Sequence, residues 1–281
     1  MPEIKDLCNI IMVTYNRIEY TKITLESLLR NTSYEPHELI VVDNNSTDGT
    51  VDYLRGLEQG GKINRLILNP ENIGLAFAIN KGFESARGGF IAISENDVLY
   101  PPRWLETMLD YIIKIPELGV ISSVNHYRQL LGDKYRANLK LLHGIEIDLE
   151  QNNVPNGSIV FRRELFEKVG KFRRVANRVF GGEDWDFCQR VRKAGYIVAY
   201  TPDLLVEHLD MPNHPLSLRY TTYLEHTKKM LRLKGIDAEK QIEAEKNWKA
   251  GEPLPAAKRA FLVKVWDRIL MIIENIKEIL R

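Results

Sequence analysis

The sequence predicts an α/β protein with a mostly parallel central sheet and helices on both of its faces. Near-continuous apolar runs, such as residues 7–14 and 37–43, alternate with segments of helical spacing, such as residues 21–30. Apolar runs of this kind are typical of strands that are buried on both faces. Because strands that alternate with helices through short connections usually pair in parallel, the alternation predicts the sheet.

Local signals place the individual elements. Pro101 and Pro102 precede a helix, since proline is tolerated in the first helical turn. Gly195 is suited to end another helix as a left-handed C-cap. The predicted strands are residues 7–14, 37–43, 63–69, 89–95, 118–124, 157–163, 196–201 and 204–208. The predicted helices are residues 21–30, 50–59, 74–86, 103–114, 164–170 and 184–194.

The chain of 281 residues divides into a sheet-forming domain, residues 1–212, and a C-terminal helical extension, residues 213–281. Within the domain, residues 125–155 show no sustained periodicity and are expected to form a long irregular segment. Such long segments in compact domains usually carry function. In the extension, residues 216–250 are charged and helical in pattern, and GEPLP at 251–255 interrupts them.

Residues 256–281 are expected to form an amphipathic helix. Its apolar side chains recur at the spacing of a coiled-coil seam: Leu262, Trp266, Ile269, Ile273, Ile276 and Leu280. Basic residues accompany this seam, and tryptophan suits a membrane interface. Three roles therefore stay open for the helix: docking on its own domain, pairing in a homo-oligomer, and peripheral contact with an anionic membrane.

Composition excludes several classes of protein. With 39 basic and 38 acidic residues the net charge is +1, so no global field attracts nucleic acid. Cys8 and Cys188 form no disulfide framework or metal motif, which favours a reducing compartment. The N-terminal residues make a poor signal peptide, and no apolar run reaches the ~18 residues of a membrane span. We expect a cytoplasmic protein, with the inner face of the membrane as its place of peripheral contact.

Polar residues follow four of the predicted strands. They are Thr14 to Arg17, Asp43 to Ser46, Asn69 to Asn72 and Glu95 to Asp97. In an open parallel sheet, ligands bind beyond the carboxyl ends of the strands. The row of polar groups therefore predicts a site for a polar, elongated ligand, although such residues also make turns and helix caps.

The order of these segments resembles the family 2 glycosyltransferases, which have the GT-A fold. The resemblance covers residues 9–209, and the matching stretches are IIMVTYNR, LIVVDNNSTDGT, NPENIGLAFAINKGFESARGGFIAISEND, GSIVFRRELFEKVGKF and GGEDWDFCQRVRKAGY. It implies a Rossmann-like nucleotide-binding half and an acceptor half. It also implies an enzyme of the hexosyltransferase type, active in polysaccharide biosynthesis, that transfers a sugar from a nucleotide-sugar to a hydroxyl acceptor with inversion.

The resemblance implies a divalent cation, Mn²⁺ or Mg²⁺, to neutralise the departing diphosphate. Glu95-Asn96-Asp97 stands where the family has its Asp-x-Asp metal motif. Asp97 is expected to be the direct ligand, and Glu95 to contact the donor ribose or the metal through water. His208 matches a metal-binding histidine of many members, with His214 close enough in sequence to compete.

The resemblance also assigns the catalytic base. By its match to the Glu-Asp element of the family, Asp184 is the expected general base, and Glu183 would bind acceptor hydroxyls or orient the base. The simpler alternative is that these acids only favour the helix dipole. For the acceptor, a glycan or a lipid-linked molecule, the expected contacts are Trp185, Asn156 and Gly157.

For the donor, the residues that match the family's nucleotide site lie on the first four strand ends and the third helix. UDP is the expected nucleotide, with dTDP and GDP as alternatives. The expected donor-binding residues are Thr14, Tyr15, Arg17, Asp43, Asn72, Lys81 and Asn96. The rival hypothesis is a non-catalytic module that binds sugar nucleotides or glycans, with Glu95 as the sign of a degenerate metal motif.

Overall fold

The computed structural model describes residues 4–125, 138–150, 154, 157–173 and 182–210. The expected helices at 216–250 and 256–281 lie outside this range, and so does the proposed domain boundary at residue 212. Asn156 and His214 lie outside it as well.

The described chain alternates strands and helices in the predicted manner. The strands are β1 (Ile4–Thr14), β2 (His37–Asp43), β3 (Arg65–Leu68), β4 (Gly88–Ser94), β5 (Val98–Leu99), β6 (Leu118–Asn125), β7 (Leu139–Leu142), β8 (Ile145–Leu149), β9 (Ser158–Arg162) and β10 (Ile197–His208). The helices are α1 (Ile18–Asn31), α2 (Thr50–Gln59), α3 (Leu75–Ser85), α4 (Trp104–Lys114), α6 (Arg163–Val169) and α7 (Glu183–Lys193).

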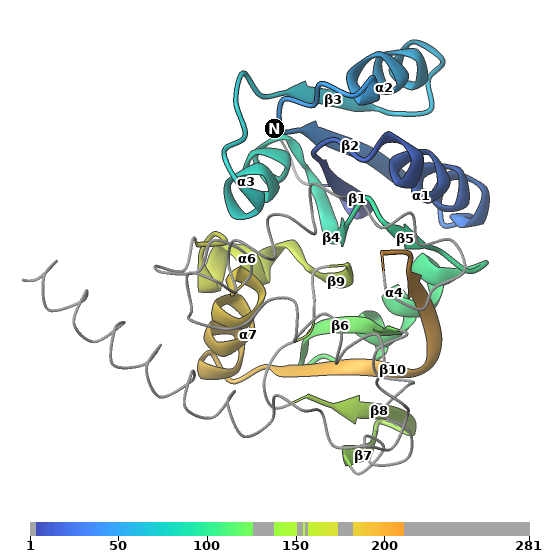
Figure 1. Cartoon of the computed structure of the whole chain (residues 1–281). Helices are drawn as coiled ribbons and strands as arrows, with labels where there is room; N and C mark the ends of the chain where they lie inside the picture. The colour runs from blue at the N-terminus through green and yellow to red at the C-terminus, as the bar shows by residue number, and fades with distance from the viewer. Residues whose placement is uncertain (1–3, 126–137, 151–153, 155–156, 174–181, 211–281) are drawn as a thin grey trace, which may run out of the picture.

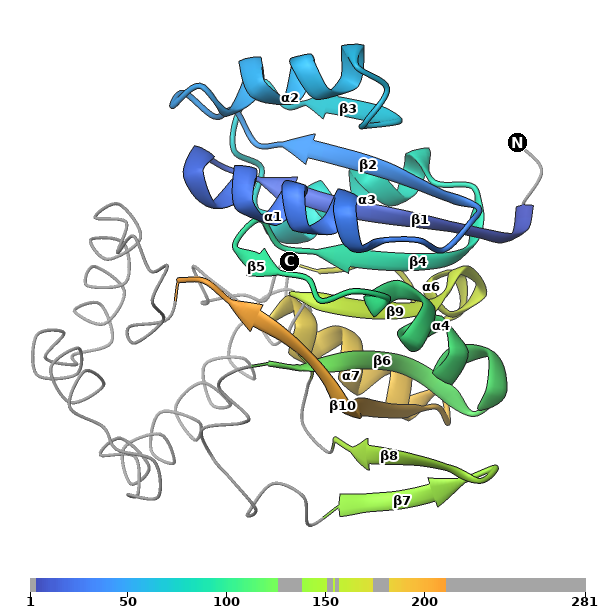
Figure 2. The ribbon, with the colours of Figure 1, turned by 90° about the vertical axis from the view of Figure 1, so that its right-hand side faces the viewer.

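One sheet runs through the described structure in the order β3-β2-β1-β4-β9-β6-β10-β8-β7 (Figure 2). Strands β3, β2, β1 and β4 are parallel, and β6 is parallel to β10. Strand β9 joins these two groups, because it pairs antiparallel with both β4 and β6. The predicted α/β fold with a parallel core is confirmed, and its second half is mixed.

Helices cover both faces of the sheet, with α1 and α4 on one side and α3, α6 and α7 on the other (Figure 1). The strands bury alternate side chains in the two resulting cores. On β1, for example, Ile10 and Met12 pack in the core beneath α1 and α4, whereas Ile11 and Val13 pack in the core beneath α3. Burial of both faces explains why the strands read as continuous apolar runs.

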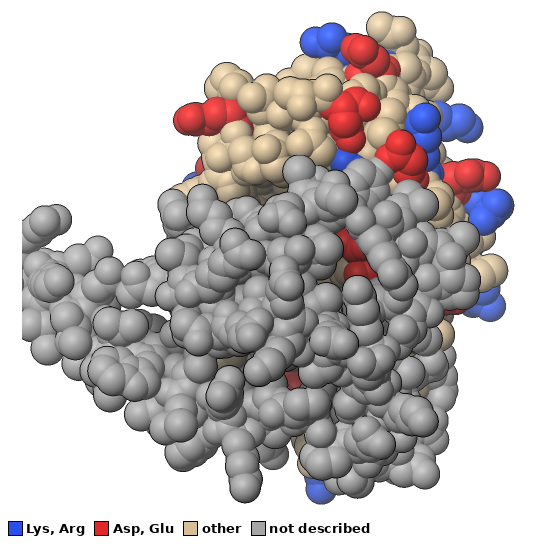
Figure 3. All heavy atoms as spheres, in the orientation of Figure 1, with Lys and Arg blue, Asp and Glu red and all other residues tan. Residues whose placement is uncertain are grey.

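Charged side chains of both signs are interspersed over the described part of the face in Figure 3. This mixture agrees with the near-equal totals of basic and acidic residues. Among the described residues, no helix is long and apolar enough to cross a membrane.

Three features differ from the sequence-based expectation. The expectation of an irregular segment is wrong for residues 139–149, where β7 and β8 form a hairpin. Its two-residue turn has positive φ angles at His143 and Gly144, as a type I′ turn requires, but lacks the common Asn-Gly signature. The two predicted last strands form one long strand, β10, and the two-residue β5 has no pattern of its own.

Close packing of α3 on β1 predicts that Gly82→Ala destabilises the fold. A Cβ atom at Gly82 would lie 2.5 Å from Cγ2 of Ile11, so the helix and strand would have to separate. We expect a loss of about 1–3 kcal/mol in the free energy of unfolding, measured by urea denaturation.

Gly56→Ala is the matched control, since Gly56 is also helical and its Cβ would meet nothing within 4 Å. This change is expected to stabilise by up to about 1 kcal/mol through helix propensity. Equal effects of the two substitutions would contradict the packing argument.

Candidate active site

The carboxyl ends of four parallel strands meet at one edge of the sheet. Thr14 pairs with Asp43, and Asp43 pairs with Leu68. Met12 pairs with Ser94, which places Glu95 level with the last residues of β1. The structure thus brings together the four polar segments that the sequence singled out.

The junction of β1 and β2 holds the buried carboxylate of Asp43. Its oxygens accept hydrogen bonds from Thr14 Oγ1 at 2.8 Å, from Ser46 N at 2.8 Å and from Ser46 Oγ at 2.5 Å. Asp43 is completely buried. Tyr15, the next residue after Thr14, is instead 47% exposed and available for contact with a ligand.

A second polar chain runs from the end of β2 to α3. Asn69 Nδ2 donates to Asn44 Oδ1 at 2.8 Å, and Lys81 Nζ donates to Asn69 Oδ1 at 2.6 Å. Asn72 accepts a hydrogen bond from the backbone N–H of Gly74 at the start of α3. The structure therefore places Lys81 beside the strand ends, and Asn72 in the turn that leads into the helix.

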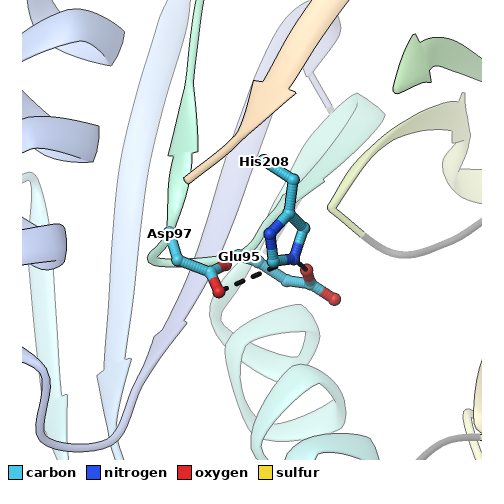
Figure 4. Close-up of side chains that lie close together, drawn as sticks. All are labelled: Glu95, Asp97 and His208. Carbon is cyan, nitrogen blue, oxygen red and sulfur yellow. Dashed lines mark ion pairs between the residues drawn. The ribbon is translucent and has the colours of Figure 1, made fainter. Parts of the chain in front are cut away.

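Glu95, Asp97 and His208 form a cluster at the end of β4 (Figure 4). His208 Nε2 lies 3.7 Å from Glu95 Oε2 and 3.6 Å from Asp97 Oδ2. One potential ligand atom from each residue lies within 4.8 Å of the others. The antiparallel pairing of His208 with Val98 positions the histidine, because it brings the end of β10 beside the residues after β4.

The charges of this cluster are strongly coupled. Burial, followed by the negative charge of Asp97, raises the pKa of Glu95 to about 7. Burial also opposes ionisation of Asp97, yet His208 and Arg17 hold the pKa of Asp97 below its ordinary value. Arg17 pairs with Asp97 and not with Glu95, so the two carboxylates beside one imidazole leave room for a further positive charge.

The donor set suits a hard divalent cation. Carboxylate oxygens are the ligands that Mg²⁺ and Mn²⁺ prefer, and a neutral imidazole nitrogen can complete the set. The other ring nitrogen of His208, Nδ1, is buried without a hydrogen-bond partner among the described residues. Nε2, which faces both carboxylates, is therefore the nitrogen placed for a cation.

Arg17 lies against the cluster and not in the open site. Its Nη2 is 2.7 Å from Asp97 Oδ2 and 2.8 Å from Asp210 Oδ2. Asn96 is also turned inward, since its amide donates to Thr21 Oγ1 at 2.9 Å. Both were expected to bind the donor nucleotide, and the structure gives both of them contacts within the protein.

The acidic start of α7 lies close enough to affect the cluster. Asp184 and Glu183 both raise the pKa of Glu95, after the larger effects of burial and Asp97. Gly182 precedes the helix with φ of 99°, a conformation that favours glycine. The carboxylate of Asp184 accepts a hydrogen bond from the backbone N–H of Trp185 at 2.7 Å, and Glu183 is buried.

Gly157 lies directly beside the cluster. A Cβ atom at this position would come within 3.3 Å of Glu95 Oε2. The Gly157 carbonyl also accepts a hydrogen bond from Tyr100 Oη at 3.1 Å. The structure thus places this expected acceptor residue next to a candidate metal ligand.

Sequence reasoning missed two members of the site, Asp210 and Tyr20. Asp210 binds Arg17 and also accepts a hydrogen bond from Tyr20 Oη at 2.9 Å. The available signal was alternation: Asp210 follows His208 by two residues in LLVEHLD, so both can lie on the same side of an extended chain. Tyr20 carried no comparable signal, because one aromatic in a helix usually belongs to the core.

Comparison with known proteins decides the family. The sequence profile described as glycosyl transferase family 2 matches residues 9–170. The chain belongs to this family. It is a glycosyltransferase, as the sequence resemblance predicted, and this finding argues against the non-catalytic module.

Similar proteins occur in both bacteria and archaea. An uncharacterized glycosyltransferase of Haemophilus influenzae is 25% identical over 80% of this chain and 72% of its own length. A glucosyl-dolichyl phosphate glucuronosyltransferase of Haloferax volcanii is 26% identical over 71% of this chain and 68% of its own. The putative teichuronic acid biosynthesis glycosyltransferase TuaG of Bacillus subtilis is 34% identical, but over only 39% of this chain and 43% of its own.

Solved structures confirm the GT-A fold. The mannosyltransferase PcManGT of Pyrobaculum calidifontis, in complex with GDP-Man and Mn²⁺, matches with a TM-score of 0.61 and 21% identity. The match covers 91% of this chain and 69% of the mannosyltransferase. Residues 1–349 of S. aureus TarS, in complex with UDP-GlcNAc, match with a TM-score of 0.58 and 18% identity, over 86% and 71% of the two chains.

The raised pKa of Glu95 predicts how pH affects the metal-free glycosyltransferase. A carboxyl whose pKa rises from 4.5 to about 7 on folding stabilises the fold while it is protonated. Its contribution is complete below pH 4.5 and is lost as pH rises through about 7. Relative to Glu95→Gln, the wild-type chain should therefore lose about 1.4 kcal/mol of unfolding free energy per unit of pKa shift.

The measurement is urea denaturation of both proteins in EDTA at a series of pH values. Glu146→Gln is the control, because Glu146 is exposed on the β7–β8 hairpin at the edge of the sheet, away from the cluster. A difference between wild type and Glu95→Gln that does not change with pH would contradict the raised pKa.

Proposed function

We propose that this glycosyltransferase transfers a sugar from a nucleotide-sugar to a hydroxyl acceptor, with inversion, and that it uses a divalent cation and an aspartate base. The observation that carries the proposal is the convergence of Glu95, Asp97 and His208 beside the acidic start of α7. Charge neutralisation and proton removal would thus operate within one site. These are the two requirements of glycosyl transfer from a diphosphate donor.

The donor nucleotide would bind at the ends of β1 and β2. A carboxylate offers about four acceptor positions, and Asp43 uses three of them within the protein. Because Asp43 is completely buried, an N–H group of a base would reach the fourth position only after displacing the side chains that cover it, whereas exposed Tyr15 offers a ring face for stacking. We propose UDP as the nucleotide. The complexes of the structural relatives with GDP-Man and UDP-GlcNAc support a nucleotide-sugar donor in general.

Asp97 and His208 would hold the cation, with Glu95 as a further ligand or as a contact through water. When bound, a Mn²⁺ or Mg²⁺ ion supplies the positive charge that stabilises the departing diphosphate. The Mn²⁺ in the PcManGT complex supports this choice of ion. Lys81, held by Asn69 near the strand ends, would add positive charge toward the nucleotide.

Asp184 would accept the proton of the acceptor hydroxyl as the new bond to the sugar forms. Its carboxylate is partly buried in the first turn of α7, and its bond to Trp185 N restrains its orientation. A base that delivers the hydroxyl opposite the leaving group produces inversion. Glu183 would orient the base or bind acceptor hydroxyls.

The acceptor would lie between the cluster and α7, against Trp185 and Gly157. Asn156 would contribute from the neighbouring position in the sequence. We propose a glycan or a lipid-linked acceptor, in line with the teichuronic acid and dolichyl phosphate chemistry named for two relatives. The catalytic domain would end near residue 212. The C-terminal helix would then provide membrane contact or subunit contact.

Substitution of the two aspartates should separate cation binding from proton removal. Asp97→Asn is expected to abolish Mn²⁺-dependent binding of UDP, because it removes a ligand charge. Asp184→Asn should retain that binding and lower turnover of the donor by about 10²–10⁴-fold, the usual contribution of a general base. Calorimetry of UDP binding and UDP release from the donor measure the two effects.

Asp186→Asn is the matched control for the base. Asp186 lies in the same helical turn as Asp184, but it is ion-paired with Arg190 at 2.7 Å. Turnover in this variant should stay within about threefold of wild type. Equal losses in Asp184→Asn and Asp186→Asn would refute the assignment of the base.

A further inference from the structure

A buried ionic network connects the candidate metal ligands to α1. Arg17 Nη2 bridges the carboxylates of Asp97 and Asp210, at 2.7 and 2.8 Å. The side chains of Arg17, Asp97 and Asp210 are only 16%, 6% and 5% exposed. Tyr20 completes the network, since its hydroxyl donates to Asp210 and its ring lies 5.0 Å from the guanidinium.

The contact between Arg17 and Asp97 opposes the binding of a cation. Arg17 bonds to Oδ2 of Asp97, and the same oxygen faces His208 Nε2 at 3.6 Å. A cation held between Asp97 and His208 would share this oxygen with a guanidinium. Because like charges repel strongly at short range in a partly buried site, Arg17 must weaken cation binding unless its charge is balanced elsewhere.

Asp210 supplies that balance. It binds the same Nη2 atom from the other side, so the charge of Arg17 is divided between two carboxylates. Burial raises the pKa of Asp210, while the charge of Arg17 and the hydrogen bond from the Tyr20 hydroxyl favour its ionised form. Burial of the three charged groups strengthens their mutual interactions relative to a surface ion pair.

The backbone holds His208 and Asp97 together independently of Arg17. The N–H of Leu209 donates to the carbonyl of Asp97 at 2.7 Å, and His208 pairs with Val98 between β10 and β5. Loss of the guanidinium should therefore change the charge at the cluster more than its geometry. The direction in which each substitution changes the cation affinity can therefore be predicted.

We propose that Asp210 sets the cation affinity of the active site by drawing the charge of Arg17 away from the metal ligand Asp97. Arg17 and Asp210 are then positioning residues that act through Asp97. The inference rests on the proposed cation-dependent function, and it gives Arg17 a role different from donor binding. The pair would keep the Asp97 carboxylate oriented when no cation is bound, and Asp210 would help Arg17 to release the Oδ2 atom of Asp97 to a cation.

The test is the affinity for Mn²⁺ alone, measured by titration with electron paramagnetic resonance detection of free Mn²⁺. Asp210→Asn should weaken Mn²⁺ binding by about tenfold, the lower end of the effect of groups that contact metal ligands. Arg17→Gln should tighten it by a similar factor. In the double variant, the Asp210→Asn change should have less than about a threefold effect, because its partner is absent.

Asp52→Asn is the control for a change in net charge, since Asp52 is 88% exposed on α2. It should leave the Mn²⁺ affinity unchanged. Circular dichroism checks the fold of each variant. If Asp210→Asn does not fold, the tightening expected for Arg17→Gln decides the question alone.

Four outcomes are decisive. The proposed shifts in opposite directions support the inference. Unchanged affinity in both single variants, while wild type binds Mn²⁺ and Asp97→Asn does not, would overturn the inference and leave the cation-dependent function standing. Weaker binding of metal-free UDP to Arg17→Gln would overturn it in favour of direct donor binding. A wild-type chain that binds no Mn²⁺ would overturn both proposals.

Discussion

The pairing of β10 with the two-residue strand β5 is the interaction on which the candidate site depends. Asp97 and His208 are far apart in sequence. Asp97 follows β4, whereas His208 is the last residue of β10. The β5–β10 ladder and the bond from Leu209 N to the Asp97 carbonyl place them side by side. This contact holds the end of β10 beside the residues that follow β4. It thereby brings His208 and Asp210 to the acidic segment at residues 95–97.

The same convergence has an electrostatic cost that the structure offsets locally. Carboxylates are gathered at a partly buried position, where ionised groups are less stable without partners. Arg17 and His208 supply positive charge for Asp97, whereas Glu95 is held with a raised pKa. The proposed cation site thus holds two acids of one short motif in different electrostatic environments. Glu95, which stands where the family's Asp-x-Asp motif has its first aspartate, is the acid with less compensating positive charge.

Much of this arrangement could be predicted from the sequence, because it depends on local pattern and on the topology of parallel sheets. Continuous apolar runs identified the strands, and the polar residues after them identified the edge where they meet. Asp43 and Asp97 were found in this way, and His208 was found through the family resemblance. Their placement at the strand ends agrees with the structure, while their roles are proposals, of which the Asp97→Asn variant tests one.

Other features could not be predicted, because they depend on contacts between distant segments. Strand β5 is too short for a periodic signal, and the His-Gly turn of the β7–β8 hairpin lacks the usual residues. The orientation of Arg17 depends on Asp210, whose position is fixed only when β10 reaches β5. A sequence motif shows that an arginine is near the site, but not whether it faces the ligand or the protein.

The antiparallel insertion of β9 between β4 and β6 has a mechanical consequence. It makes the parallel strands β3, β2, β1 and β4 and the strands β6, β10, β8 and β7 parts of one continuous hydrogen-bonded sheet. Two lobes that share a sheet in this way cannot rotate apart as hinged domains without breaking a central ladder. The sheet is therefore expected to stay rigid, and side chains and connections at the strand ends are expected to move when substrate enters and product leaves.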